Sequence, residues 1–277
     1  MEHRTGHFGG AGGLRIFWQA WLPDGEPRAV VAMAHGVSEH SGRYAWTGEQ
    51  LVARGYALFA LDHRGHGKSE GARAVIDRVG NAVSDLGEMI AIAADAAVDH
   101  SKPFLLGHSM GGFLSLAFAT RRQAELRGLI LSAPVAVLEA ASPVQRIAGH
   151  VLSAVAPKLG VVGIDSTTVS RDPEVVRDYD SDPLNYHGKL PARTVHEMAQ
   201  EIGRFPETVP SITVPLLLQV GTGDELVPPK SSELVYEWAS SEDKTIKRYD
   251  GLYHEILNEP ERDAVVADTL DWLDAHS

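Results

Sequence analysis

One pentapeptide, Gly107-His108-Ser109-Met110-Gly111, constrains the fold of this chain more than any other feature. It follows the short apolar run 104–106 and precedes the apolar run 112–119, which has the character of a helix. This order predicts a strand, a sharp turn at the serine and a helix. A glycine two residues before and after the serine removes the side chains that would crowd such a turn. We therefore expect Ser109 in strained backbone geometry, with its hydroxyl raised above a sheet.

Length and composition bound the class of protein. The 277 residues suit one large α/β domain with room for an insertion. The absence of cysteine from the sequence excludes disulfides, thiolate metal sites and cysteine nucleophiles. A net charge of -12 argues against a nucleic-acid partner and against electrostatic attachment to anionic lipid. Residues 1–13 are polar and glycine-rich, and no apolar run is long enough to span a bilayer, so we expect a soluble, cytoplasmic protein.

Short apolar, β-branched runs alternate with longer amphipathic runs along most of the chain. Near-continuous apolar strands between helices are typical of a mostly parallel sheet that helices cover on both faces. The sequence therefore predicts an α/β fold. Seven runs are expected to be strands: 14–22, 29–34, 57–61, 104–106, 129–131, 215–220 and 245–249.

The alternation breaks between residues 135 and 210. Prolines are frequent there, and one stretch has an apolar helical face formed by Val144, Ile147, Val151 and Val155. A loop of this length without structure of its own is improbable in a compact domain. We interpret 135–210 as an inserted, mainly helical cap over the C-terminal edge of the sheet, where ligands of open α/β sheets bind. Residues 1–134 and 211–277 then form the core domain.

A serine hydroxyl needs an adjacent base before it can act as a nucleophile. In folds with this strand, turn and helix, the acidic residue and then the histidine follow the serine along the chain. Asp224 follows an apolar strand in a glycine-rich loop, and His254 follows the last expected strand. We therefore predict a catalytic triad of Ser109, Asp224 and His254. Glu225 remains a rival to Asp224, whereas Asp250 is too near His254 in sequence to orient it easily.

Stabilising the charge that develops on a carbonyl oxygen requires two backbone N–H groups. Met110 follows the nucleophile and is expected to supply one, and the loop after an early central strand supplies the other, which points to Val37. No catalytic metal is expected, because the histidine pairs near in sequence lack a convincing third ligand.

Six segments resemble the monoglyceride (monoacylglycerol) lipases of the α/β-hydrolase superfamily, and their bacterial members in particular. The segments are HGVSEHSGRY (35–44), LDHRGHGKS (61–69), GHSMGG (107–112), SRDPEV (170–175), YDSDPL (179–184) and GLYHE (251–255). The resemblance extends from about residue 14 to 275. It implies an α/β-hydrolase fold, with a mostly parallel central sheet flanked by helices and an inserted cap. It also implies hydrolysis of monoacylglycerol to fatty acid and glycerol without a cofactor.

The resemblance carries over to single residues. It supports the triad and the two N–H donors, and it implies that Glu39, Arg43 and Tyr179 help to line a polar pocket for the glycerol head group. Some members have a second histidine three residues after the catalytic one. Here that position is Leu257, and Asn258 or Glu259 could take its place.

Two other functions fit the same residues. One is a broader carboxylesterase or lysophospholipase on the same scaffold. The other is a non-catalytic lipid-binding receptor, although such a protein would be expected to lose a member of the triad. The apolar face of the cap helix either contacts membranes or lipid aggregates peripherally, or packs onto the sheet domain.

Overall fold

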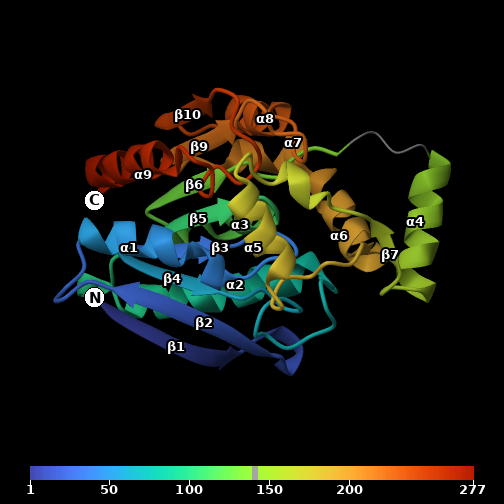
Figure 1. Cartoon of the computed structure of the whole chain (residues 1–277), viewed down its shortest axis with the longest axis horizontal. Helices are drawn as coiled ribbons and strands as arrows, with labels where there is room; N and C mark the ends of the chain where they lie inside the picture. Colours follow the sequence, from blue (N-terminus) through green and yellow to red (C-terminus); the bar gives the residue numbers. More distant parts are fainter. Residues whose placement is uncertain (139–142) are drawn as a thin grey trace.

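A mostly parallel sheet organises the fold. The computed structural model describes residues 1–138 and 143–277, without the side chains of 99 and 143–146. Eight strands of these described residues form one sheet in the order β1-β2-β4-β3-β5-β6-β9-β10 (Figure 1). Strand β2 pairs antiparallel with β1 and β4, and every pairing from β4 to β10 is parallel. The strands are β1 (Glu2–Gly9), β2 (Arg15–Leu22), β3 (Val30–Ala34), β4 (Ala57–Leu61), β5 (Phe104–His108), β6 (Gly128–Ser132), β9 (Leu216–Gly221) and β10 (Lys244–Tyr249).

Helices cover both faces of the sheet. Helices α1 (Ala45–Ala53) and α9 (Arg262–His276) pack on one face, and α2 (Val79–Asp95), α3 (Met110–Arg122) and α8 (Lys230–Trp238) pack on the other. Along β4, Leu58 and Ala60 belong to the first core, whereas Phe59 and Leu61 belong to the second. Burial on both sides explains why the central strands are nearly continuous apolar runs, with His108, Ser132 and Gln219 at or near the C-terminal ends of β5, β6 and β9.

The seven expected strands all overlap strands of the sheet, and the predicted α/β-hydrolase architecture is confirmed. Strand β1 was missed. It pairs with β2 along its whole length, from Glu2 opposite Leu22 to Gly9 opposite Arg15, but it lies at the sheet edge with most side chains exposed. An edge strand with little buried surface shows no apolar alternation, so its sequence gave no strand signal. Short 3₁₀ helices occupy Ala11–Gly13, Ser41–Tyr44, Val98–His100, Gln123–Glu125, Ser166–Thr168 and Val209–Ser211.

The interval between β6 and β9 holds a separate group of elements. Strands β7 and β8 form a small antiparallel pair, and α6 packs through Met198 and Ile202 onto the core beside α2. Helix α4 lies at the outer edge of the molecule, beyond α6 and β7 (Figure 1). The division into a core domain and a cap at 135–210 stays a prediction. The elements are α4 (Pro143–Val155), β7 (Gly160–Val162), α5 (Pro173–Ser181), β8 (Leu190–Pro191), α6 (Ala192–Ile202) and α7 (Phe205–Thr208).

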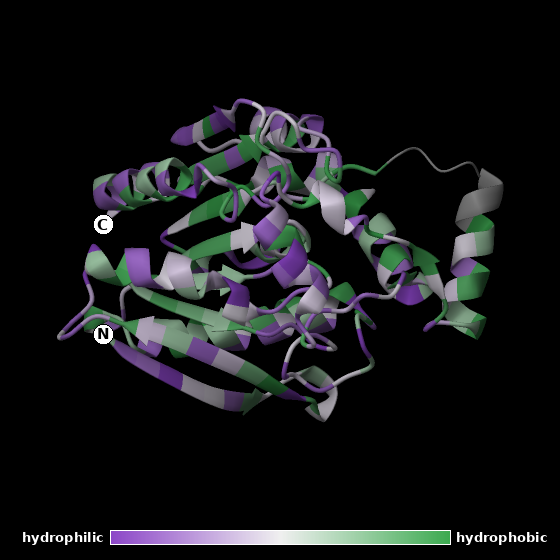
Figure 2. Ribbon diagram, in the orientation of Figure 1, coloured by the Kyte–Doolittle hydropathy of each residue, from purple (hydrophilic) through white to green (hydrophobic). Residues whose placement is uncertain are grey.

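The apolar face of α4 is not packed on the sheet. The exposed fractions of Ile147, Val151 and Val155 are 67%, 51% and 74%, and apolar residues are visible along the helix (Figure 2). The side chain of Val144 lies outside the described residues. Packing onto the sheet domain, one of the two interpretations of this face, is therefore wrong for these three residues. No helix among the described residues is long and apolar enough to cross a membrane.

Candidate active site

Ser109 stands at the turn between β5 and α3, as the glycine spacing predicts. Its backbone has φ 54° and ψ -117°, a conformation that is strained for a residue with a side chain. A Cβ on Gly107 would lie 2.6 Å from the carbonyl oxygen of Gly111, and a Cβ on Gly111 would collide with the carbonyl oxygen of Ala34. Only glycine at both positions allows β5, α3 and the loop after β3 to approach so closely.

The structure brings the three predicted triad residues together. Nε2 of His254 lies 2.8 Å from Oγ of Ser109, and Nδ1 of His254 lies 2.7 Å from Oδ2 of Asp224. The other Asp224 oxygen accepts the N–H groups of Leu226 at 2.9 Å and Val227 at 2.8 Å. Both oxygens of this carboxylate are thus fixed in place.

The rivals of Asp224 lie elsewhere. The side chain of Glu225 is exposed to solvent, and that of Asp250 is exposed and accepts a hydrogen bond from Thr222. Geometry therefore selects Asp224 as the carboxylate that faces His254.

Charges around His254 set its protonation. Burial opposes the imidazolium, but the charge and hydrogen bond of Asp224, together with the charges of Glu255 and Glu39, outweigh it and raise the pKa of His254. A neighbouring imidazole behaves in the opposite way. Burial, and then the charge of His254, lower the pKa of His108 to about 3, so His108 stays neutral at physiological pH.

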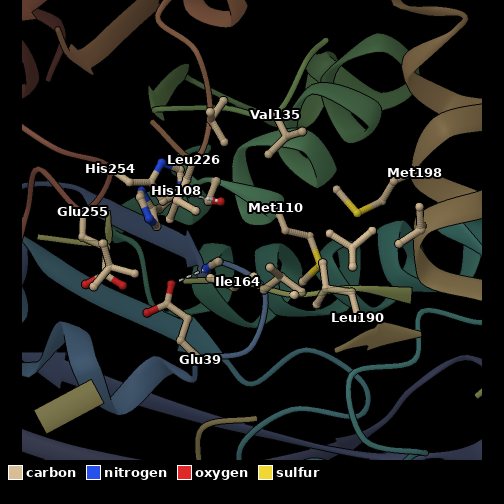
Figure 3. A pocket seen from close by; sticks show the side chains of 18 of the residues that line it. Glu39, His108, Met110, Val135, Ile164, Leu190, Met198, Leu226, His254 and Glu255 are labelled. Atoms are coloured by element: carbon tan, nitrogen blue, oxygen red, sulfur yellow. Dashed lines mark hydrogen bonds between the residues drawn. The ribbon is translucent and has the colours of Figure 1, made fainter. Parts of the chain in front are cut away.

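A cavity of about 230 Å³ opens over Ser109 and His254. One end carries polar side chains, namely Glu39, Tyr179 and Glu255. The other end is apolar. Figure 3 shows Glu39, Glu255 and His254 toward one side of the cavity and Leu190 and Met198 toward the other. The remaining apolar lining comes from Val135, Leu138, Val162, Ile164, Val169, Val195, Leu226 and Val227. The two predicted N–H donors, Val37 and Met110, also line this cavity.

The predicted head-group residues form one buried ionic cluster. Arg43 donates to Glu39 at 2.9 Å and to both oxygens of Glu255 at 2.6 and 2.7 Å, and its guanidinium lies 5.0 Å from the ring centre of Tyr179. Glu39 also accepts hydrogen bonds from the hydroxyl of Tyr44 and the N–H of Gly36. Arg43 itself lines an adjoining polar cleft rather than the cavity that contains Ser109.

Sequence reasoning missed Glu255. The residue belongs to the segment GLYHE, but its partner Arg43 lies 212 residues away, so no local pattern could reveal the ion pair. Asn258, one of two candidates to replace the absent histidine, donates to Glu255 at 3.0 Å. Glu259, the other candidate, holds Arg171 at 2.7 Å.

The described residues offer no metal site with three or more protein ligands. Within residues 1–138 and 143–277, no group of three or more His, Cys, Asp or Glu side chains is placed to hold a metal ion.

A buried serine, histidine and aspartate joined at the C-terminal edge of a mostly parallel sheet define a serine hydrolase of the α/β-hydrolase class. Residues 25–261 match the family model described as "Serine aminopeptidase, S33". The monoacylglycerol lipase of Mycolicibacterium smegmatis is 40% identical over 97% of this chain and 96% of that protein. Human monoglyceride lipase is 35% identical over 91% of this chain and 84% of that protein.

Solved structures agree with the sequence relatives. The crystal structure of Paleococcus ferrophilus monoacylglycerol lipase superposes with a TM-score of 0.82, at 30% identity over 100% of both chains. The chain belongs to the monoacylglycerol lipase family of the α/β-hydrolase superfamily.

Proposed function

We propose that this chain hydrolyses the ester bond of monoacylglycerols and releases fatty acid and glycerol. The observation that carries the proposal is that Ser109 and His254 line one cavity with polar side chains toward one side and apolar side chains toward the other. A monoacylglycerol has the same division, with a polyol on one side of its ester and a hydrocarbon chain on the other. The names of the relatives support this choice of substrate.

The first half of the reaction makes an acyl-enzyme. Nε2 of His254 accepts the proton of Ser109 as the hydroxyl oxygen attacks the ester carbonyl. Asp224 holds His254 in the tautomer that presents a lone pair to the serine and stabilises the imidazolium that forms. The N–H groups of Val37 and Met110 bind the developing oxyanion, and the N-terminal end of α3 adds a favourable dipole.

The second half releases the acid. The tetrahedral intermediate collapses, and His254 gives its proton to the departing glycerol oxygen. His254 then takes a proton from water, which attacks the acyl-enzyme, and returns it to Ser109 as the fatty acid leaves. These steps use only side chains of this chain, two backbone N–H groups and water.

The polar end of the cavity favours a neutral polyol over an amine. An aminopeptidase substrate would bring an α-ammonium group, which needs an unpaired carboxylate. Here Glu39 and Glu255 are both paired with Arg43. Their oxygens remain acceptors for hydroxyl groups, so glycerol fits the pair better than a peptide N-terminus does. In this proposal Glu39, Glu255 and Tyr179 contact the head group, and Arg43 orients the two glutamates from behind.

The apolar end is proposed to bind the acyl chain beneath the cap. Burial of each methylene stabilises by about 0.8 kcal/mol, so long chains gain affinity until the cavity is filled. This end distinguishes a lipase from an esterase of small acids.

Hydrolysis of a monoacylglycerol by the Ser109→Ala variant tests the assignment. We expect kcat to fall by several orders of magnitude, and a fluorophosphonate probe to label the native protein but not the variant. Near-normal turnover by the variant would refute the mechanism. An unlabelled native protein would favour a lipid-binding receptor. Comparison of monoacylglycerol with lysophosphatidylcholine and short esters separates the proposed function from that of a lysophospholipase or a broad carboxylesterase.

The protein is also proposed to contact lipid aggregates peripherally through α4. Ile147, Val151 and Val155 project apolar side chains into solvent, and a net charge of -12 makes neutral or zwitterionic lipid the better surface. Substitution Ile147→Asp with Val151→Asp should reduce sedimentation with phosphatidylcholine vesicles while leaving hydrolysis of a dissolved short ester unchanged. Val98→Asp, at an exposed apolar residue outside the cap, is the control. Equal binding by all three proteins would contradict this contact.

A further inference from the structure

Two histidines meet where α4 lies against α6. Nδ1 of His150 is 3.4 Å from Nε2 of His196, and their ring centres are 5.1 Å apart. Neither residue belongs to the active site or to the cavity above it. Both line a separate open cleft of about 440 Å³, which also contains Gln200, one helical turn after His196.

The separation of the two nitrogens suits a shared metal ion better than a hydrogen bond. Protein hydrogen bonds from nitrogen are usually about 2.7–3.2 Å long, so 3.4 Å is long for a direct N–H···N contact. Zinc binds imidazole nitrogen at about 2.0–2.1 Å in tetrahedral geometry, which places two nitrogen ligands about 3.3–3.4 Å apart. The distance between Nδ1 of His150 and Nε2 of His196 therefore equals that between two nitrogen ligands of one tetrahedral ion.

The carboxylates nearby are already engaged. Glu197 accepts the N–H of Val79 at 3.0 Å and pairs with Arg193 at 2.9 Å. Glu201 pairs with Arg121 at 2.6 Å. A metal ion held by the two imidazoles would therefore complete its coordination with water, for which the open cleft has room.

We propose that His150 and His196 form a two-histidine site for a divalent transition-metal ion of the zinc type, which fastens α4 to α6. The guanidinium of Arg193 on α6 lies 3.4 Å from the hydroxyl oxygen of Ser153 on α4. A bridging ion adds two coordinate bonds across the same interface. Because α4 carries the exposed apolar face, the ion fixes the surface that is proposed to meet lipid. Metal binding itself does not depend on ester hydrolysis.

The experiment is titration of the metal-free full-length protein with zinc chloride, followed by calorimetry. The variants are His150→Ala, His196→Ala and the double variant, and His7→Ala, at an exposed histidine of β1, is the matched control. We expect one ion to bind the native and control proteins. Each single substitution should weaken binding about tenfold or more, and the double variant should be no weaker than the weaker single variant, because one ligand alone makes no site.

Hydrogen exchange of α4 amides supplies a second readout. Zinc should slow exchange in α4 of the native protein and leave it unchanged in His196→Ala. His150 is exposed, so its removal is not expected to unfold the protein, and thermal melting checks this. Equal zinc affinity in all variants would overturn the site. Zinc binding through the pair without slower exchange in α4 would contradict the proposal that the ion holds α4 against α6.

Discussion

Arg43 and Glu255 form a bidentate ion pair between the segment after β3 and the loop after β10, with N–O distances of 2.6 and 2.7 Å. Glu255 directly follows His254 in the chain. On the other side, Arg43 holds Glu39, which accepts the N–H of Gly36 in the loop that carries Val37. One guanidinium thus connects the backbone of the proposed base with the backbone of a proposed oxyanion donor. Breaking the pair affects both sides of the site.

We expect Glu255→Gln to shift the pH dependence of kcat/KM to lower pH. His254 must be neutral to accept the serine proton, so activity falls as pH drops through its pKa. Burial lowers that pKa, but Asp224 and then Glu255 and Glu39 outweigh burial and raise the pKa above 6.5. Removing the Glu255 charge lowers the pKa of His254 and moves the acidic limb of the pH profile to lower pH. The profile on a soluble ester measures this, with Glu26→Gln, at an exposed residue, as control.

The same substitution removes one of the two carboxylates that pair with the buried guanidinium of Arg43. Loss of one member of a buried ion pair costs about 3–5 kcal/mol, so denaturant unfolding should show a clear loss of stability. An acidic limb at the same pH as in the native protein would show that the Glu255 charge does not act on His254.

Asp224→Asn should lower kcat by about four orders of magnitude with little change in fold. The two N–H groups of Leu226 and Val227 already point at Oδ1. They will keep the amide oxygen on their side and turn the amide NH₂ toward Nδ1 of His254. That nitrogen must then accept, so Nε2 carries the proton and cannot receive another from Ser109. Glu225→Gln is the matched control, and equal losses in both variants would contradict the choice of Asp224.

Much of the core could be predicted because its signals are local. The glycines that the turn at Ser109 needs lie within one pentapeptide, and the buried parallel strands are apolar at most positions. Other features are set by distant partners. Nothing near Glu255 in sequence indicates Arg43, and nothing near His150 indicates His196. The apolar face of the helix at 143–155 was recognised, but periodicity alone could not show that Ile147, Val151 and Val155 face solvent rather than the sheet.

Neutral buried histidines under the loop after β3 should make the protein sensitive to acid. His35 donates from Nδ1 to the carbonyl of Gly36 at 2.7 Å and accepts the N–H of His63 at 3.0 Å, which fixes its neutral tautomer. Burial, with nearby charges, lowers the pKa of His63 to about 3 and that of His66 to about 4. Unfolding raises each toward 6.5, so the unfolded state binds more protons below that pH. Stability is full above pH 6.5 and falls between pH 6.5 and about 3, the folded-state pKa of His63.

His63→Phe tests this contribution. Neither ring nitrogen of His63 has a hydrogen-bond partner among the described residues, so a phenyl ring removes the protonation site without breaking a side-chain hydrogen bond. Each such histidine steepens the loss by up to about 1.4 kcal/mol per pH unit. We expect the variant to lose less stability than the native protein between pH 7 and pH 5, measured by denaturant unfolding. Parallel curves for the two proteins would place the acid sensitivity elsewhere.

Met198 should set the acyl-chain length that the cavity accepts. Its side chain is buried at the apolar end, on α6, far from the polar residues that face the head group (Figure 3). Met198→Trp fills that end, and each methylene that can no longer be buried costs about 0.8 kcal/mol, close to fourfold in kcat/KM. A series of monoacylglycerols should therefore show normal rates for short chains and a decline that begins at a shorter length than in the native protein. Short-chain activity is the internal control, because Ser109 and His254 are unchanged. An identical length profile would mean that the chain leaves the cavity by another path, along Leu226 and Val227 rather than toward α6.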